Sequence, residues 1–203
     1  MSFGYDLPDE HEQLRGTVRA FAEGSLAAEA ERLDREGRFP VELVEQAAEL
    51  GLLGIPLPES AGGSGFDTLA YAIAIEELAR IDSSFAITVA AHTSLGTMPI
   101  HLYGSDEQRA RWLPDLAAGR RLAAFGLTEP GAGSDAGATR TSARLEDGSW
   151  VIDGSKMFIT NAGTPMSALV TITARTGEDE ISNIVVENGT PGYGQSEPLK
   201  KMG

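Results

Sequence analysis

The chain has 203 residues, of which 41% are hydrophobic and 23% are charged, a composition that is typical of folded globular proteins and excludes extensive disorder. Its formal net charge of −14 would repel nucleic-acid phosphates, so we expect no nucleic-acid partner. It contains no cysteine, which excludes disulfides, thiolate metal sites and a cysteine nucleophile, so any redox chemistry has to come from a cofactor.

The N-terminal region is acidic, with Asp6, Asp9, Glu10 and Glu12 at positions where a signal peptide would carry positive charge. No apolar run in the chain approaches the roughly 18 residues that a membrane-spanning helix needs. We therefore expect a protein without a membrane segment that works in the cytoplasm.

The first part of the chain, up to about residue 119, has the hydrophobic period of helices. Leu14, Val18 and Phe21 share one face of a predicted amphipathic helix. Pro40 favours the first turn of a second helix because its φ is already fixed near the helical value. Proline lacks an N–H, but an N–H in the first turn would have no partner within the helix. Gly51 is typical of the position where such a helix ends.

The rest of the helical part begins with a loop, predicted over residues 53–65 from two prolines and clustered glycines and serines. Asp67 or Thr68 can cap the helix that follows, and a very apolar helix over residues 84–103 is expected to be buried. Residues 105–108 fit a capping box for a last helix, which ends before the strands begin.

Beyond Arg121 the hydrophobic period changes to that of strands. Strands are predicted over residues 139–146, 150–153, 157–160, 169–175 and 181–187. A tight hairpin turn is predicted at Asp147–Gly148. The pattern indicates an α+β fold, with an all-helical domain over residues 1–120 and an antiparallel β domain over residues 121–203. Because the chain ends soon after its last predicted strand, we expect this β domain to be incomplete.

The segment from residue 125 to 135 reads Phe-Gly-Leu-Thr-Glu-Pro-Gly-Ala-Gly-Ser-Asp, a strand that runs into a glycine-rich turn. Gly131 and Gly133 let a ligand approach the backbone closely, while Thr128 and Ser134 supply hydroxyl donors. These features favour an anion-binding turn. On residue types alone, a surface turn between two domains explains the segment equally well.

A second segment, over residues 153–163, reads Asp-Gly-Ser-Lys-Met-Phe-Ile-Thr-Asn-Ala-Gly. Together, residues 127–135 and 154–161 resemble the two flavin-binding signatures of the acyl-CoA dehydrogenase family. The resemblance extends through residues 56–65, 76–80, 104–108 and 201–203. It implies the family's fold, FAD as the cofactor and an acyl-CoA as the substrate.

By this resemblance, eight residues contact the flavin: Phe125, Leu127, Thr128, Gly133, Ser134, Phe158, Ile159 and Thr160. Ser134 would also meet the acyl-CoA, and the Thr160 hydroxyl would lie near flavin N5. Many relatives carry tryptophan where Phe158 stands. Phenylalanine keeps the aromatic wall for the flavin but lacks the indole N–H of tryptophan, so one possible hydrogen bond is lost. No metal site is expected.

The family reaction removes the α-proton of an acyl-CoA thioester with a carboxylate base while hydride passes to flavin N5, which yields a trans-2-enoyl-CoA. The resemblance also implies an electron-transfer flavoprotein as the electron acceptor and a homotetramer for the full-length enzyme. In most of the family the base is a glutamate of a C-terminal helical domain. We therefore expect no catalytic base in this chain, and little or no turnover by the chain alone.

Other titratable groups are weaker candidates for chemistry. Glu129 lies within the first signature and Glu77 on a helix, and a structural role fits both better than a base. His11 is expected on a polar helix face, and His92 and His101, on the apolar helix, are expected to be packed or rim residues. No spacing among the histidines suggests a metal site.

Two other functions fit the same signatures. One is a non-catalytic module that binds flavin or acyl-CoA, against which the unfinished sheet argues because exposed strand edges promote aggregation. The other is an acyl-CoA oxidase or a flavin monooxygenase on the same scaffold, in which oxygen replaces the electron-transfer partner.

Overall fold

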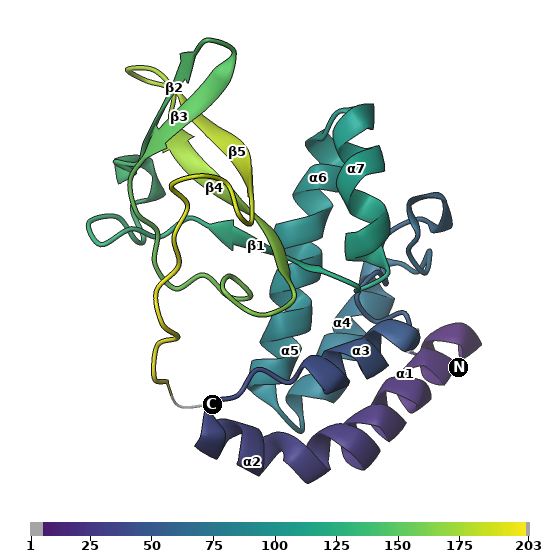
Figure 1. The fold of residues 1–203 in the computed structure, drawn as a ribbon. Helices are drawn as coiled ribbons and strands as arrows, with labels where there is room; N and C mark the ends of the chain where they lie inside the picture. Colours follow the sequence, from purple (N-terminus) through teal and green to yellow (C-terminus); the bar gives the residue numbers. More distant parts are fainter. Residues whose placement is uncertain (1–5, 202–203) are drawn as a thin grey trace.

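The computed structural model describes residues 6–201, in which a group of helices is followed by a sheet (Figure 1). The last α-helix ends at Ala117, and the first strand begins at Leu122. The expected α+β order is confirmed, whereas the division into domains at residues 120 and 121 stays a prediction. Met202 and Gly203, which belong to one of the segments that carry the resemblance, lie outside the described residues.

The helices follow one another with short connections, except for the loop over residues 50–67. They are α1 (Asp9–Phe21), α2 (Ala27–Glu36), α3 (Val41–Glu49), α4 (Thr68–Ala79), α5 (Ser83–Ala90), α6 (Met98–Tyr103) and α7 (Asp106–Ala117). A π-helical turn, Ala22–Leu26, joins α1 to α2, and another, Ala91–Thr97, joins α5 to α6. The apolar stretch predicted as one helix is therefore continuous helical structure. None of the described helices combines the length and the apolar character that crossing a membrane requires.

Local signals of the sequence set the helix ends. The Asp67 carboxylate caps α4 by accepting the Ala70 N–H at 2.8 Å. Ser105 and Gln108 form the expected capping box at the start of α7, each side chain accepting the backbone N–H of the other. Such caps satisfy N–H groups that have no partner within the helix, which is why short-range sequence predicts them.

The main core joins the helices to the beginning of the sheet. Val18, Leu26 and Leu78 are fully buried, and Leu122 of the first strand belongs to the same apolar cluster. Transfer of such side chains out of water is the main favourable contribution to folding, on the order of 2 kcal/mol for each. The helices and the first strand therefore stabilise one another.

His11 differs from its expected position on a polar face. It is only 4% exposed, and its Nε2 lies 2.9 Å from Oδ1 of Asp67. The expectation was wrong because the N-terminus of α4 packs against this face of α1, a contact that helical period cannot reveal.

Glu77 of α4 is 3% exposed and binds two arginines, one in α1 and one directly after α4. Its Oε1 lies 2.7 Å from Nη2 of Arg19 in α1, and its Oε2 lies 2.6 Å from Nη1 of Arg80. Hydrogen bonds from Arg19 lower the pKa of Glu77 to about 2, an effect that burial opposes and Arg80 reinforces. The carboxylate therefore links α1 to the end of α4.

Replacing Glu77 with glutamine is expected to lower the free energy of unfolding by about 2 kcal/mol at neutral pH, because a neutral amide cannot hold the arginines as a carboxylate does. The depressed pKa stabilises the fold above pH 4.5, and this contribution is lost as the pH falls from 4.5 towards 2. Urea denaturation of the wild type and of Glu77→Gln, at neutral pH and at about pH 3, measures this contribution to stability. A stability difference of the same size at both pH values would contradict the ion-pair explanation.

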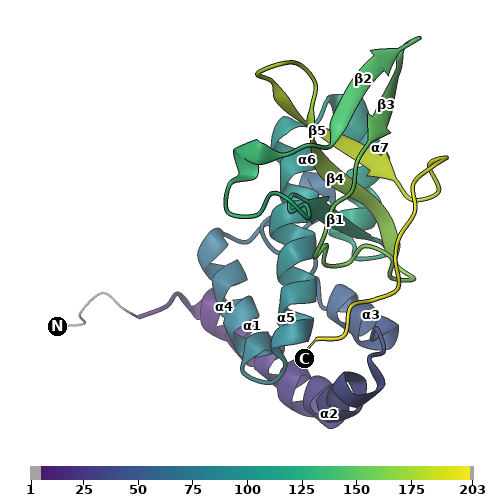
Figure 2. The same ribbon diagram turned by 90° about the vertical axis from the view of Figure 1, so that its left-hand side faces the viewer.

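In the described part of the chain the sheet has five strands. They are β1 (Leu122–Gly126), β2 (Ser142–Glu146), β3 (Ser149–Asp153), β4 (Ser167–Arg175) and β5 (Ile181–Glu187). β4 pairs with β1, β2 and β5, and β3 pairs with β2. Figure 2 shows that the sheet lies beside the column formed by α5 and α6. Close approach there requires a glycine, since a Cβ on Gly96 would lie 2.6 Å from the Cβ of Ala123.

The sheet is mixed, which corrects the expectation of an antiparallel one. The pairs β2–β3 and β4–β5 are antiparallel, but β1 runs parallel to β4, and β2 meets β4 in parallel at one residue pair. Parallel neighbours need a long connection, and residues 127–166, which include the β2–β3 hairpin, provide one between β1 and β4. Strand periodicity alone carries no information on strand direction.

Two local expectations in the sheet have different outcomes. The hairpin turn is confirmed, with φ of 48° at Asp147 and 79° at Gly148, the positive values that a two-residue turn requires. The strand predicted over residues 157–160 is wrong, because this stretch is irregular and Phe158 has a φ of 59°. A left-handed residue there interrupts the extended backbone that a strand needs.

Candidate functional site

The first segment, residues 125–135, leaves the C-terminal end of β1, a strand at the edge of the sheet. A hydrogen-bonded turn over residues 129–132 follows the strand. The residues of this segment that the resemblance assigns to the flavin are half-buried or exposed: Phe125, Leu127, Thr128, Gly133 and Ser134. Their surface is therefore open to a ligand.

The second segment, residues 153–163, connects β3 to β4. Its residues assigned to the flavin also have accessible surface: Phe158, which is 60% exposed, and the half-buried Ile159 and Thr160. Asn161 is buried with a φ of 72°, and its Nδ2 donates to the Thr88 carbonyl of α5 at 2.9 Å. This bond anchors the segment to the helices and leaves the preceding residues at the surface.

The structure brings the two segments into direct contact. The Met157 N–H donates to the Thr128 carbonyl at 2.7 Å, and the Lys156 ammonium donates to the Leu127 carbonyl at 3.2 Å. Residues from both signatures thus meet at the end of β1. Gly133 and Ser134 lie farther along the loop.

The charges beside this contact are internal to the protein. Glu129 is 6% exposed, and its Oε1 lies 2.7 Å from the Nζ of Lys156. Burial would raise the pKa of Glu129, but hydrogen bonds from Lys156 and Thr139 outweigh burial and lower the pKa below its usual range. A carboxylate bound in this way is a poor proton acceptor, which agrees with the structural role expected for Glu129.

Sequence reasoning missed three residues of this arrangement: Lys156, Thr139 and Thr173. The Lys156 Nζ lies 2.9 Å from the hydroxyls of Thr139 and Thr173. A signal was present, because Lys156 precedes the apolar Met157–Ile159 and a lysine in such a place needs a buried partner. The partner lies 27 residues away, so it could not be identified from the spacing.

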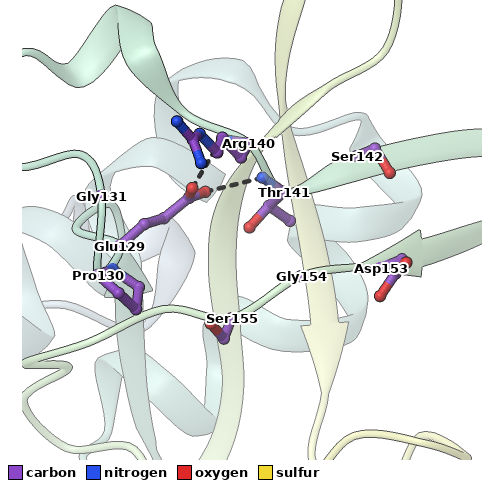
Figure 3. Close-up of a pocket in the computed structure, with 9 residues that line it drawn as sticks. All are labelled: Glu129, Pro130, Gly131, Arg140, Thr141, Ser142, Asp153, Gly154 and Ser155. Atoms are coloured by element: carbon purple, nitrogen blue, oxygen red, sulfur yellow. Dashed lines mark hydrogen bonds between the residues drawn. The ribbon is translucent and has the colours of Figure 1, made fainter.

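A cavity of about 350 Å³ opens beside the first segment (Figure 3). Its lining comes from residues 129–131, 140–142 and 153–155. The Glu129 carboxylate is directed at the backbone of Arg140 and Thr141, whose N–H groups donate to it at 2.7 and 3.0 Å. None of the residues assigned to the flavin lines this cavity, so it is not the predicted flavin surface.

Comparison with known families matches nearly the whole chain. Residues 8–120 match the family described as acyl-CoA dehydrogenase, N-terminal domain, and residues 124–203 match acyl-CoA dehydrogenase, middle domain. The described structure is likewise helical in the first of these ranges, and the second contains β2 to β5 and most of β1.

Individual relatives agree with these matches. The chain is 42% identical over 202 residues to the probable acyl-CoA dehydrogenase YngJ of Bacillus subtilis, over 98% of this chain and 53% of that protein. It is 41% identical over 200 residues to the human mitochondrial short-chain specific acyl-CoA dehydrogenase, over 98% of this chain and 48% of that protein. The chain therefore spans about half the length of the curated relatives it matches.

A solved structure has the same fold. The crystal structure of an acyl-CoA dehydrogenase from Bacillus anthracis, complexed with FAD, matches with a TM-score of 0.91 at 38% identity. The match covers 98% of this chain and 35% of that chain.

Proposed function

The chain belongs to the acyl-CoA dehydrogenase family, and from this premise we propose that it carries the FAD-binding part of an enzyme that oxidises an acyl-CoA thioester to a trans-2-enoyl-CoA. The proposed partners are an acyl-CoA substrate and an electron-transfer flavoprotein. We propose a homotetramer located in the cytoplasm as the working form of the full-length enzyme.

One observation carries the proposal. Two segments that are far apart in sequence meet through the bond from Met157 N–H to the Thr128 carbonyl. At this contact the chain presents an aromatic ring at Phe158 and a threonine from each segment, Thr128 and Thr160, at least partly exposed. An apolar wall with a few hydroxyl groups suits a flat heteroaromatic ring that has polar edges.

The glycines of the first segment fit the phosphate end of FAD. A Cβ built on Gly131 or Gly133 would meet no protein atom within 4 Å, and neither residue has a positive φ. Nothing among residues 6–201 therefore demands a glycine at either position. Close approach of a ligand such as a pyrophosphate to the backbone N–H groups would explain both residues.

In this proposal the residues of the chain bind and orient the cofactor and the substrate, and FAD, when bound, supplies the hydride acceptor. Ser134 would contact both the FAD phosphates and the acyl-CoA, while Thr128 and Thr160 would donate hydrogen bonds to polar atoms of the flavin ring. The α-proton of a thioester is weakly acidic, so the reaction also needs a positioned base. Glu129, the buried carboxylate of the first segment, is bound to Lys156 and is not free to act as that base. We therefore propose that the base comes from outside these segments.

The test is the visible absorption spectrum of the purified 203-residue chain after incubation with FAD and removal of the excess. We expect a retained flavin band with resolved structure, because both signature segments are in place. A chain that is folded by circular dichroism and retains no flavin would contradict the proposal that these residues suffice for binding.

Addition of butyryl-CoA without oxygen separates binding from turnover. This probe suits the comparison, since one relative is named short-chain specific. We expect the flavin band to shift without bleaching, because in this proposal the thioester binds beside the flavin and the base comes from outside the two segments. Rapid bleaching would show that a base is present in the chain and would overturn that part of the proposal.

A further inference from the structure

Lys156 is a buried cation at the junction of the two segments. Its side chain is 5% exposed, and its ammonium lies within hydrogen-bond distance of four oxygen acceptors. The acceptors are Glu129 Oε1 at 2.7 Å, Thr139 Oγ1 at 2.9 Å, Thr173 Oγ1 at 2.9 Å and the Leu127 carbonyl at 3.2 Å. An ammonium has three N–H groups, so its donor capacity is fully used.

The carboxylate of Glu129 is equally saturated. It accepts the N–H groups of Arg140 and Thr141, the hydroxyl of Thr139 and the ammonium of Lys156. Both members of the ion pair are thus held from several directions at once, and the pair has one orientation in the fold.

Such a pair is a weak source of net stability. Removing two charges from water costs several kcal/mol for each ion, and replacing a buried pair with neutral side chains is often neutral or stabilising. What a saturated buried pair does provide is a defined geometry, because each charge needs all of its partners in place. An explanation by stability alone therefore accounts poorly for Glu129 and Lys156.

The position of the pair indicates what this geometry controls. Glu129 directly follows Thr128, and Lys156 is separated from Phe158 by one residue. The Lys156 ammonium also binds the Leu127 carbonyl. Movement of the pair would therefore shift the flavin-facing residues of one segment against those of the other.

We propose that Glu129 and Lys156 are a positioning pair, which sets the two flavin-binding segments at the relative distance that FAD requires. Neither residue is proposed to touch the reacting atoms. This inference rests on the proposed function, namely that the two segments bind FAD.

The experiment compares three forms of the chain: wild type, Lys156→Met, and the double variant Glu129→Gln with Lys156→Met. Thermal unfolding without FAD measures stability, and titration with FAD, followed by flavin fluorescence and the visible spectrum, measures affinity. The single variant leaves a buried carboxylate unpaired, so its unfolding midpoint should fall by roughly 10 °C. The double variant removes both charges and should recover most of that loss.

A positioning role and a purely structural role differ in what happens to FAD in the double variant. We expect its dissociation constant for FAD to rise at least about tenfold, with loss of the resolved shape of the flavin band, although its stability has recovered. Recovery of affinity together with stability would overturn the positioning role and leave the proposed function intact. A wild-type chain that binds no FAD would overturn both.

Two further variants complete the design. Thr173→Val removes one acceptor of the ammonium from β4 without changing any charge, and we expect FAD affinity to fall about threefold. If the double variant does not fold, unchanged affinity in Thr173→Val overturns the proposal. Glu77→Gln is the matched control, because it also neutralises a buried carboxylate but lies in α4. It should lower stability and leave FAD affinity unchanged.

Discussion

Replacing His92 with leucine is expected to lower the free energy of unfolding by about 3 kcal/mol at neutral pH, because the buried Ala123 N–H loses its bond to the ring and the Leu116 carbonyl loses one of its donors. His92 is fully buried, its Nδ1 accepts the Ala123 N–H of β1 at 3.0 Å, and its Nε2 donates to the Leu116 carbonyl of α7 at 2.9 Å. This one ring therefore connects α5 and α6 to α7 and to the sheet.

The pH dependence of stability gives a second signature of His92. Burial lowers the pKa of His92 from 6.5 to about 4, although the bond to the Leu116 carbonyl opposes the change. Between these values the unfolded chain binds a proton that the folded chain does not, so wild-type stability falls as the pH drops from 6.5 to 4. The loss amounts to about 3 kcal/mol and is absent from the leucine variant.

Urea denaturation of both proteins between neutral pH and about pH 4 measures the two effects together. The difference in unfolding free energy between the wild type and His92→Leu should be largest at neutral pH and should become smaller towards pH 4. His101→Leu is the control, since His101 is half-buried in α6, and its replacement should change stability by less than about 1 kcal/mol. A His92→Leu variant with wild-type stability at neutral pH would contradict the bridging role.

Adding a side chain at Gly133 is expected to remove FAD binding without affecting the fold. A Cβ there would meet no protein atom within 4 Å, so valine should leave the unfolding midpoint unchanged. If Gly133 faces the phosphates of FAD, the isopropyl group occupies space that the ligand needs, and the dissociation constant should rise at least about 100-fold.

Gly194→Val is the matched control for Gly133→Val. A Cβ on Gly194 also meets no protein atom within 4 Å, and this glycine likewise lacks a positive φ, but it lies outside both segments. Fluorescence titration with FAD compares the two variants with the wild type. Equal affinity in all three proteins would remove Gly133 from the flavin site.

The sequence predicted those features of the candidate site that depend on residue type within one segment. The pair of signatures identified both segments, and the structure brings them together at the end of β1. The sequence did not predict the arrangement of charges between the segments. The acceptors of Lys156 come from the first segment, from the residues before β2 and from β4, so only the folded chain assembles them.

By itself, the sequence determined most of the helices, the caps of α4 and α7 and the hairpin at Asp147–Gly148, whereas it did not indicate α2. These features depend on interactions between residues a few positions apart, which local period, capping side chains and the φ preference of glycine describe well. Only the tertiary structure decided that β1 runs parallel to β4, that His11 is buried and that residues 157–160 are irregular. Each of these depends on a contact with a distant part of the chain, and the free energy of such contacts outweighs local preference.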